Sequence, residues 1–95
     1  MKNTIGSTPV EWDEEKNKSN IKKHGISFET AALVFADENR IELYDRLHSD
    51  NEDRFIILGR VHDILFVVYT MRTENARLIS ARLATPAERK IYYEE

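Results

Sequence analysis

Hydrophobic positions along the chain follow two periods, a helical one in the first part and an alternating one in the second. In residues 28–36, apolar side chains recur at spacings of three and four, as on the buried face of a helix: Phe28, Ala31, Ala32 and Phe35. From residue 40 onward, polar and apolar residues alternate, which is typical of strands with one buried face. These alternating segments are Arg40–Asp45, Arg54–Val61 and Arg77–Ala84.

A fourth strand is predicted over Ile64–Thr70, which is apolar on both faces. That pattern is typical of a strand inside a sheet rather than at its edge. The connections on either side, His62–Asp63 and Thr73–Ala76, are short enough for hairpin turns, and Asn75 is suited to a positive φ. We therefore expect one antiparallel sheet with Ile64–Thr70 in its interior.

Capping signals mark the ends of the helices. Asp13 and Gly25 fit the N-cap and the C-terminal stop of a helix over Glu14–His24. Because this helix is polar on nearly every side, we expect it to be a surface element. Ser27 fits the N-cap of the second helix, over residues 28–36.

A final helix over Pro86–Tyr93 is predicted by Thr85-Pro86-Ala87-Glu88, which combines a cap, an early proline and a capping-box glutamate. The order of elements gives an α+β fold with two N-terminal helices, a three- or four-stranded antiparallel sheet and a C-terminal helix. We expect residues 10–95 to form a single domain and Met1–Pro9 to be a flexible leader.

Composition narrows the function classes. The 95 residues are 41% hydrophobic and 33% charged, enough apolar content for one small core. There is no cysteine, which excludes disulfides and thiolate metal sites. No apolar run approaches the length of a membrane helix, so we expect no membrane association and a cytoplasmic protein.

The charge balance argues against a strongly nucleic-acid-binding protein, because the formal net charge is −3. The distribution is uneven, however: residues 1–53 carry a net charge of −5 and residues 54–95 a net charge of +2. Acidic residues concentrate in Asp37–Asp53. A local positive surface on an acidic protein is therefore compatible with the sequence.

Several short fragments, individually unspecific, occur in a distinctive order and spacing. They are Trp12-Asp13-Glu14-Glu15-Lys16-Asn17, Asn20, Lys23-His24-Gly25-Ile26-Ser27-Phe28-Glu29, Asp45-Arg46, His48-Ser49, Arg54, Gly59, Val68-Tyr69-Thr70, Ile79-Ser80-Ala81-Arg82, Ala84, Glu88-Arg89 and Tyr92. Together they resemble the BrnT-type ribonuclease toxins of bacterial toxin–antitoxin pairs. Two departures concern loops: Asn51-Glu52-Asp53-Arg54 and His62-Asp63 lack glycines that the family often carries.

The resemblance implies a RelE-like fold, cleavage of cellular RNA and inhibition by a BrnA-like antitoxin. That antitoxin would carry a ribbon-helix-helix DNA-binding domain, so operator DNA would be bound only through it. No cofactor is implied. A non-catalytic interaction module that binds a partner through the acidic middle segment is the alternative.

Metal-free RNA cleavage needs a base for the 2′-hydroxyl, an acid for the leaving 5′-oxygen and cations for the charge on phosphorus. Arginine suits the last task because its fork pairs with phosphate oxygens. Arg82 and Ser80 should project from the face of the last strand opposite Ile79, and Arg54 begins another strand. The alternative for both arginines is a solvated position on the sheet or an ion pair with the acidic segment Asp37–Asp53.

Histidines are the candidates for proton transfer. His24 ends the first helix beside Lys23, where cations are also simply favoured by the helix dipole. His48 lies in the acidic segment, where it is either an acid–base group or an exposed loop residue. Their spacing does not match a metal site, so none is expected.

The candidate catalytic set is therefore Arg82, Arg54, His24 and His48. The candidate RNA contacts are Lys23, Ser80, Arg89 and Tyr92.

Overall fold

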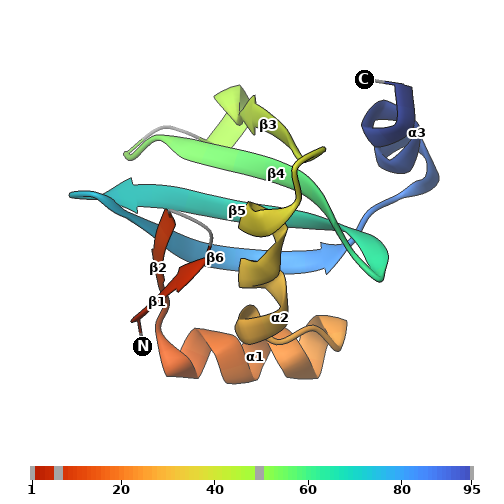
Figure 1. Ribbon diagram of the computed structural model, residues 1–95. Coiled ribbons are helices and arrows are strands. Elements are labelled where there is room, and N and C mark those ends of the chain that lie inside the picture. The colour runs from red at the N-terminus through yellow and green to blue at the C-terminus, as the bar shows by residue number, and fades with distance from the viewer. Residues whose placement is uncertain (1, 6–7, 49–50, 95) are drawn as a thin grey trace.

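The computed structural model describes residues 2–5, 8–48 and 51–94 and is a mixed sheet with helices on both faces (Figure 1). In the described residues six strands form one sheet, in the order β1-β2-β6-β5-β4-β3. The strands are β1 Lys2–Ile5, β2 Thr8–Glu11, β3 Ile41–Tyr44, β4 Arg54–Val61, β5 Asp63–Arg72 and β6 Asn75–Leu83. The helices are α1 Glu14–His24, α2 Phe28–Ala32, η1 Leu33–Ala36, η2 Arg46–His48 and α3 Pro86–Glu94.

The predicted antiparallel sheet is confirmed for β3 to β6, with β5 in its interior. The predicted strand number is too low, because β1 and β2 extend the sheet beyond β6. The sheet is also mixed, since β2 runs parallel to β6, with Val10 opposite Ala76. The segment expected to be a flexible leader thus supplies β1 and the start of β2, which pair with each other.

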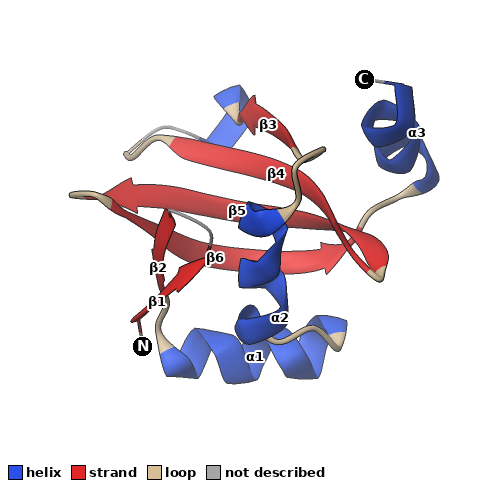
Figure 2. Ribbon diagram, in the orientation of Figure 1, coloured by secondary structure: helices blue, strands red, loops and turns tan. Residues whose placement is uncertain are grey.

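Helices α1, α2 and η1 cover one face of the sheet, where the main core lies (Figure 2). The predicted second helix is divided into α2 and η1, an α-helix followed by a 3-10 turn. Its N-cap is confirmed, since Ser27 Oγ accepts from Thr30 N at 3.1 Å. Val34 of η1 lies so close to Gly59 of β4 that a Cβ on the glycine would be 2.6 Å from Val34 Cβ. Glycine is therefore required for this packing.

Helix α1 has the predicted bounds and caps: Asp13 Oδ1 accepts from Glu15 N, and Gly25 has a φ of 74°. It attaches to the core by amides rather than by aliphatic side chains. Ile21 is 43% exposed, whereas Asn17 and Asn20 are buried. Because these amides have partners on other elements, a polar helix is held firmly on the protein.

Strand β6 contains a bulge that changes which of its side chains face the core. Val68 is opposite Ser80 and Tyr69 is opposite Leu78, so Ile79 is the extra residue. Leu78 and Ala81 are buried, and Ile79 is only partly buried. The prediction that Ile79 faces the core is therefore wrong.

Helix α3 packs over one end of the sheet on the face opposite to α1 and α2. Its Tyr92 joins Leu58 and Ile64 in a second buried cluster. These two residues alternate along their strands with Ile57 and Leu65 of the main core, so they point to the other face. The rest of that face, beside α3, carries the arginines considered below.

Candidate functional site

A basic groove runs along the edge of β6, between this strand and α1. It has a volume of about 290 Å³ and is lined by Lys16, Ser19, Asn20, Lys23, His24, Ile79 and Ser80. The helical residues recur at spacings of three and four, which places them on one side of α1. Lys16, Lys23 and His24 are exposed. The groove is thus lined by two ammonium groups, an imidazole and two hydroxyls, together with the apolar side chain of Ile79.

Asn20 fixes α1 against β6 at this groove. Its Nδ2 donates to the carbonyl oxygens of Ile26 at 2.8 Å and Ala81 at 2.9 Å. Its Oδ1 accepts from Ala81 N at 3.1 Å. The amide therefore bonds both backbone groups of Ala81, as a neighbouring strand would. This contact sets the position of His24 relative to Ser80 and Arg82, on either side of Ala81.

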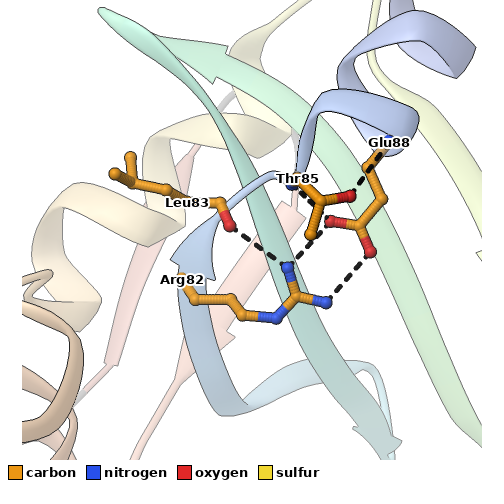
Figure 3. A network of polar contacts seen from close by, with 4 residues as sticks. All are labelled: Arg82, Leu83, Thr85 and Glu88. Carbon is orange, nitrogen blue, oxygen red and sulfur yellow. Dashed lines mark hydrogen bonds and ion pairs between the residues drawn. The ribbon is translucent and has the colours of Figure 1, made fainter.

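Arg82 is engaged by α3 (Figure 3). Its Nη1 and Nη2 donate to Glu88 Oε1 and Oε2 at 2.8 and 3.0 Å, and Nη1 also donates to Leu83 O at 3.1 Å. Its Cζ lies 3.9 Å from the centroid of the Phe66 ring. The hydrogen bond with Glu88 raises the pKa of Arg82, and the same bond lowers the pKa of Glu88. Arg82 is thus neither fully solvated nor paired with the acidic segment: its ion pair is with Glu88 of α3.

Arg54 lies on the same face of the sheet as Arg82 but toward its other end. The registers place Arg54 level with Thr70, and Arg82 level with Phe66, which is paired with Leu58. The arginines are two inter-strand spacings apart across the sheet and four residues apart along it. This corresponds to roughly 16 Å between their Cα atoms. They are therefore not brought together at one point.

His48 lies beside Arg54 instead of near His24. Leu47, His48, Asn51, Glu52 and Arg54 line a hollow of about 290 Å³. His48 Nδ1 is 3.0 Å from Asp45 Oδ2, an arrangement that orients the imidazole. Of the candidate catalytic residues, only His48 and Arg54 line one hollow. His24 lies in the groove beside β6, and Arg82 is held by Glu88 at the start of α3.

The two candidate contacts on α3 differ in accessibility. Arg89 is exposed and lines a hollow of about 210 Å³ together with His62 and Tyr93. Tyr92 is 8% exposed, and its hydroxyl donates to Asp37 Oδ2 at 2.6 Å. This burial disagrees with the expectation that Tyr92 contacts RNA, and it gives the residue a role in anchoring α3.

Sequence reasoning missed part of the groove and the partner of Arg82. Lys16 and Ser19 share the groove with Lys23, and their spacing of seven and four from it was a usable signal. Glu88 was recognised only as a capping residue. Nothing local in the sequence indicates that the same carboxylate also holds Arg82.

The acidic middle segment is largely engaged within the chain. Besides its bond to Tyr92, Asp37 Oδ2 accepts from Arg60 N at 2.8 Å. Asp53 Oδ1 accepts from Tyr44 Oη at 2.9 Å, and Glu42 pairs with Arg40. Burial alone would raise the pKa of Asp37, but its hydrogen bonds lower it overall. Among the described residues of the segment, Asp37, Glu42 and Asp53 are thus each bonded within the chain.

Neither a cluster of metal ligands nor a membrane-spanning helix is found among the described residues. Residues 2–5, 8–48 and 51–94 contain no group of three or more His, Asp or Glu side chains placed to hold a metal ion. None of the helices that the structure describes has the length and apolar content needed to cross a membrane.

Comparison with known proteins relates the chain to one protein family and to a solved structure. A sequence model of the family described as ribonuclease toxin, BrnT, of type II toxin–antitoxin systems matches residues 12–88. Among solved structures, the crystal structure of the Brucella abortus ribonuclease toxin BrnT matches with a TM-score of 0.59 and 23% identity. This match covers 80% of the present chain and 95% of the Brucella chain, and at that identity it shows a shared fold. No curated protein gave a significant match.

Proposed function

Because the chain belongs to the BrnT family of ribonuclease toxins of type II toxin–antitoxin systems, we propose that it is a cytoplasmic endoribonuclease that needs no metal ion. A BrnA-like protein antitoxin neutralises it. The observation that carries this proposal is the basic groove at the edge of β6, where His24 and two lysines meet Ser80.

The groove supplies the groups that RNA cleavage requires. In the proposed reaction the 2′-oxygen attacks phosphorus and the bond to the 5′-oxygen breaks, which leaves a 2′,3′-cyclic phosphate and a 5′-hydroxyl. His24 takes the proton of the 2′-hydroxyl or gives one to the leaving 5′-oxygen, and water carries the other proton. Lys16 and Lys23 bind phosphates, and Arg82, two residues beyond Ser80, stabilises the charge that develops on phosphorus.

Arg54 and His48 are assigned to the RNA strand farther along. They lie on the face that carries Arg82 but roughly 16 Å away, so they bind phosphates outside the cleaved linkage. Exposed Arg89 extends the contact surface on the other side. Proton transfer is thus assigned to His24. Substitution of His48 should lower the cleavage rate less than substitution of His24.

Metal independence is supported by the placement of the histidines. His24 ends α1, His48 lies in η2, and His62 lies between β4 and β5. The described residues hold no group of three or more His, Asp or Glu side chains around one point, whereas metal sites bring several ligands together. Cleavage should therefore continue in EDTA, and loss of activity that a divalent ion restores would contradict this part of the proposal.

The antitoxin is proposed to cover the groove and Arg82 together. An acidic segment of a BrnA-like partner would neutralise these cations and exclude RNA in one step. Its ribbon-helix-helix domain would make the contacts to operator DNA. A structure of the complex in which His24 and Arg82 stay open to solvent would contradict this mode of inhibition.

Single-turnover cleavage tests the assignment of His24. The chain is made by cell-free translation, which avoids toxicity to a host, and incubated with a mixed-sequence RNA. His24→Gln should lower the rate about 100-fold or more, the scale of losing an acid–base group. Lys22→Ala is the matched control, since Lys22 is an exposed cation of the same helix outside the groove. Cleavage by His24→Gln at the wild-type rate would refute the site.

A further inference from the structure

The guanidinium of Arg82 is held along one edge only. An arginine has five N–H donors in a planar fork. Three of those of Arg82 are used within the chain: one from Nη1 and one from Nη2 to Glu88, and the second from Nη1 to Leu83 O. The two that remain, on Nε and Nη2, lie together along the adjacent edge of the fork. Among the described residues, no side chain or carbonyl accepts a hydrogen bond from this pair.

The plane of the guanidinium is fixed as well. Its Cζ lies 3.9 Å from the centroid of the Phe66 ring, the cross-strand neighbour of Arg82 in the register of β5 and β6. Stacking on an aromatic face stabilises a cation and restricts its rotation. The side chain of Arg82 remains 35% exposed. The guanidinium is thus held in a fixed orientation on a side chain that is partly exposed.

Glu88, which holds the other edge, is itself fixed at the start of α3. Its Oε1 accepts from Thr85 N at 2.8 Å, and Thr85 Oγ1 accepts from Glu88 N at 3.2 Å. These are the reciprocal bonds of a capping box. Figure 3 shows Glu88 bonded to both Thr85 and Arg82. The carboxylate therefore cannot follow Arg82 to a new position without breaking its bond at the helix start.

We propose that Glu88 is a positioning residue, which orients Arg82 so that the free Nε–Nη2 edge of the guanidinium binds a phosphate oxygen of RNA in two hydrogen bonds. The inference rests on the proposed ribonuclease function. Glu88 and RNA do not compete for the guanidinium of Arg82, because the carboxylate occupies the Nη1–Nη2 edge and the phosphate is proposed to bind the Nε–Nη2 edge. Arg82 contacts the reacting group, and Glu88 acts through it.

The test separates the ion pair from the helix cap. Glu88→Gln keeps an oxygen for Thr85 N, and glutamine is compatible with a capping box. Its amide can no longer accept from both nitrogens of Arg82. Thr85→Ala is the matched control, because it weakens the cap and leaves the ion pair. Arg82→Ala and the double variant Arg82→Ala/Glu88→Gln complete a cycle.

Single-turnover cleavage of a mixed-sequence RNA is measured for each variant and corrected for the folded fraction. Misplacement of the guanidinium should lower the rate of Glu88→Gln about 10-fold or more. In the Arg82→Ala background the same change should have less than about a twofold effect, because coupled residues are not additive. Thr85→Ala should cut at nearly the wild-type rate. An unchanged or higher rate for Glu88→Gln would overturn the proposal.

A second readout does not depend on activity. In ¹⁵N-edited NMR spectra, a guanidinium held along one edge shows separate, slowly exchanging Nη hydrogens. We expect such signals for Arg82 in the wild type and in Thr85→Ala, and their loss in Glu88→Gln. If the wild type does not cleave RNA at all, the proposed function fails, while these spectra still decide whether Glu88 orients Arg82. Averaged Nη signals in the wild type would refute the orientation itself.

Discussion

Replacing Asn20 tests whether an amide can act as a strand neighbour at the edge of a sheet. The residue is 6% exposed and makes three hydrogen bonds, two to Ala81 and one to Ile26. Asn20→Ala removes all three and leaves one backbone N–H and two carbonyls without this partner. The shortened side chain cannot reach any of them, so α1 loses its polar attachment to β6.

The expected loss of stability is large for a protein of this size. Three hydrogen bonds at about 1 kcal/mol each give roughly 3 kcal/mol, and buried groups left unsatisfied cost about 1–3 kcal/mol each. Folded domains are stable by only about 5–15 kcal/mol in total. A loss of about 3 kcal/mol should lower the melting temperature by at least roughly 12 °C in a domain of under 100 residues.

Asn20→Asp is the more demanding variant, because it preserves size and the acceptor for Ala81 N. Its second oxygen would face the carbonyls of Ile26 and Ala81, and a buried carboxylate without a donor is strongly disfavoured. Asn20→Asp should therefore be less stable than Asn20→Ala at neutral pH. The difference in stability between Asn20→Asp and Asn20→Ala should become smaller as the pH falls. Burial raises the pKa of the new carboxyl, and its protonated form can donate a hydrogen bond.

Urea denaturation and thermal melting of the three proteins measure these differences. Asn39→Ala is the control, since Asn39 is exposed and should tolerate the change within about 0.5 kcal/mol. If Asn20→Asp proves as stable as the wild type at neutral pH, the amide does not donate to those carbonyls. The description of the α1–β6 contact would then be wrong.

Two further outcomes follow from the packing on the two faces of the sheet. Gly59→Ala should lower the free energy of unfolding, measured by urea denaturation, by about 1–3 kcal/mol because the new methyl group clashes with Val34. The loss should be clearly smaller in a Val34→Ala background. Equal losses in both backgrounds would contradict the clash. Burial, with the hydrogen bond and charge of Asp37, raises the pKa of Tyr92 to about 12. The hydrogen bond of Tyr92 should therefore stabilise the protein fully below pH 10, and this stabilisation should be lost as the pH rises toward about 12. Tyr92→Phe should destabilise the protein in neutral solution. In a series of urea denaturations at increasing pH, its midpoint should fall less steeply above pH 10 than that of the wild type.

Much of the fold could be predicted because local signals and tertiary contacts agree. The caps at Asp13 and Gly25 delimit α1 as the structure has it, and β4 has the bounds that alternation predicts. The parallel addition of β2 to β6 could not be predicted in this way. It depends on a pairing between residues more than sixty positions apart, for which a four-residue strand carries no period of its own.

Alternation failed in β6 for a physical reason. A bulge adds one residue to a strand without adding one to its partner, so every later side chain changes face. The sequence pattern of Arg77–Ala84 is regular and does not show where the bulge lies. Likewise, positive φ values occur at His62 and Thr73 rather than at Asn75, whose side chain bonds Glu11 instead. Tertiary contacts overrode the local preference in both cases.

The sequence indicated candidate residues for the site but not which of them lie next to one another. Lys23, His24 and Ser80 do share a groove. His48 and Arg54 lie together elsewhere, and Tyr92 is buried. Residue types indicate what chemistry a position can perform, whereas the sheet register decides which positions meet. The resemblance identified the residues without supplying that register.

The polar composition of α1 explains how its attachment and its proposed function are combined. A helix that packs by an aliphatic stripe must turn that stripe toward the core, and its charged residues then point away from neighbouring strands. Helix α1 packs by Asn17 and Asn20, whose amides bond the backbone at Phe28, Ile26 and Ala81. Because amides need little lateral room, Lys16, Lys23 and His24 can lie directly beside the bonded edge of β6. A more hydrophobic α1 would be easier to recognise as a packed helix, but it would place an apolar surface where the groove now offers cations to RNA.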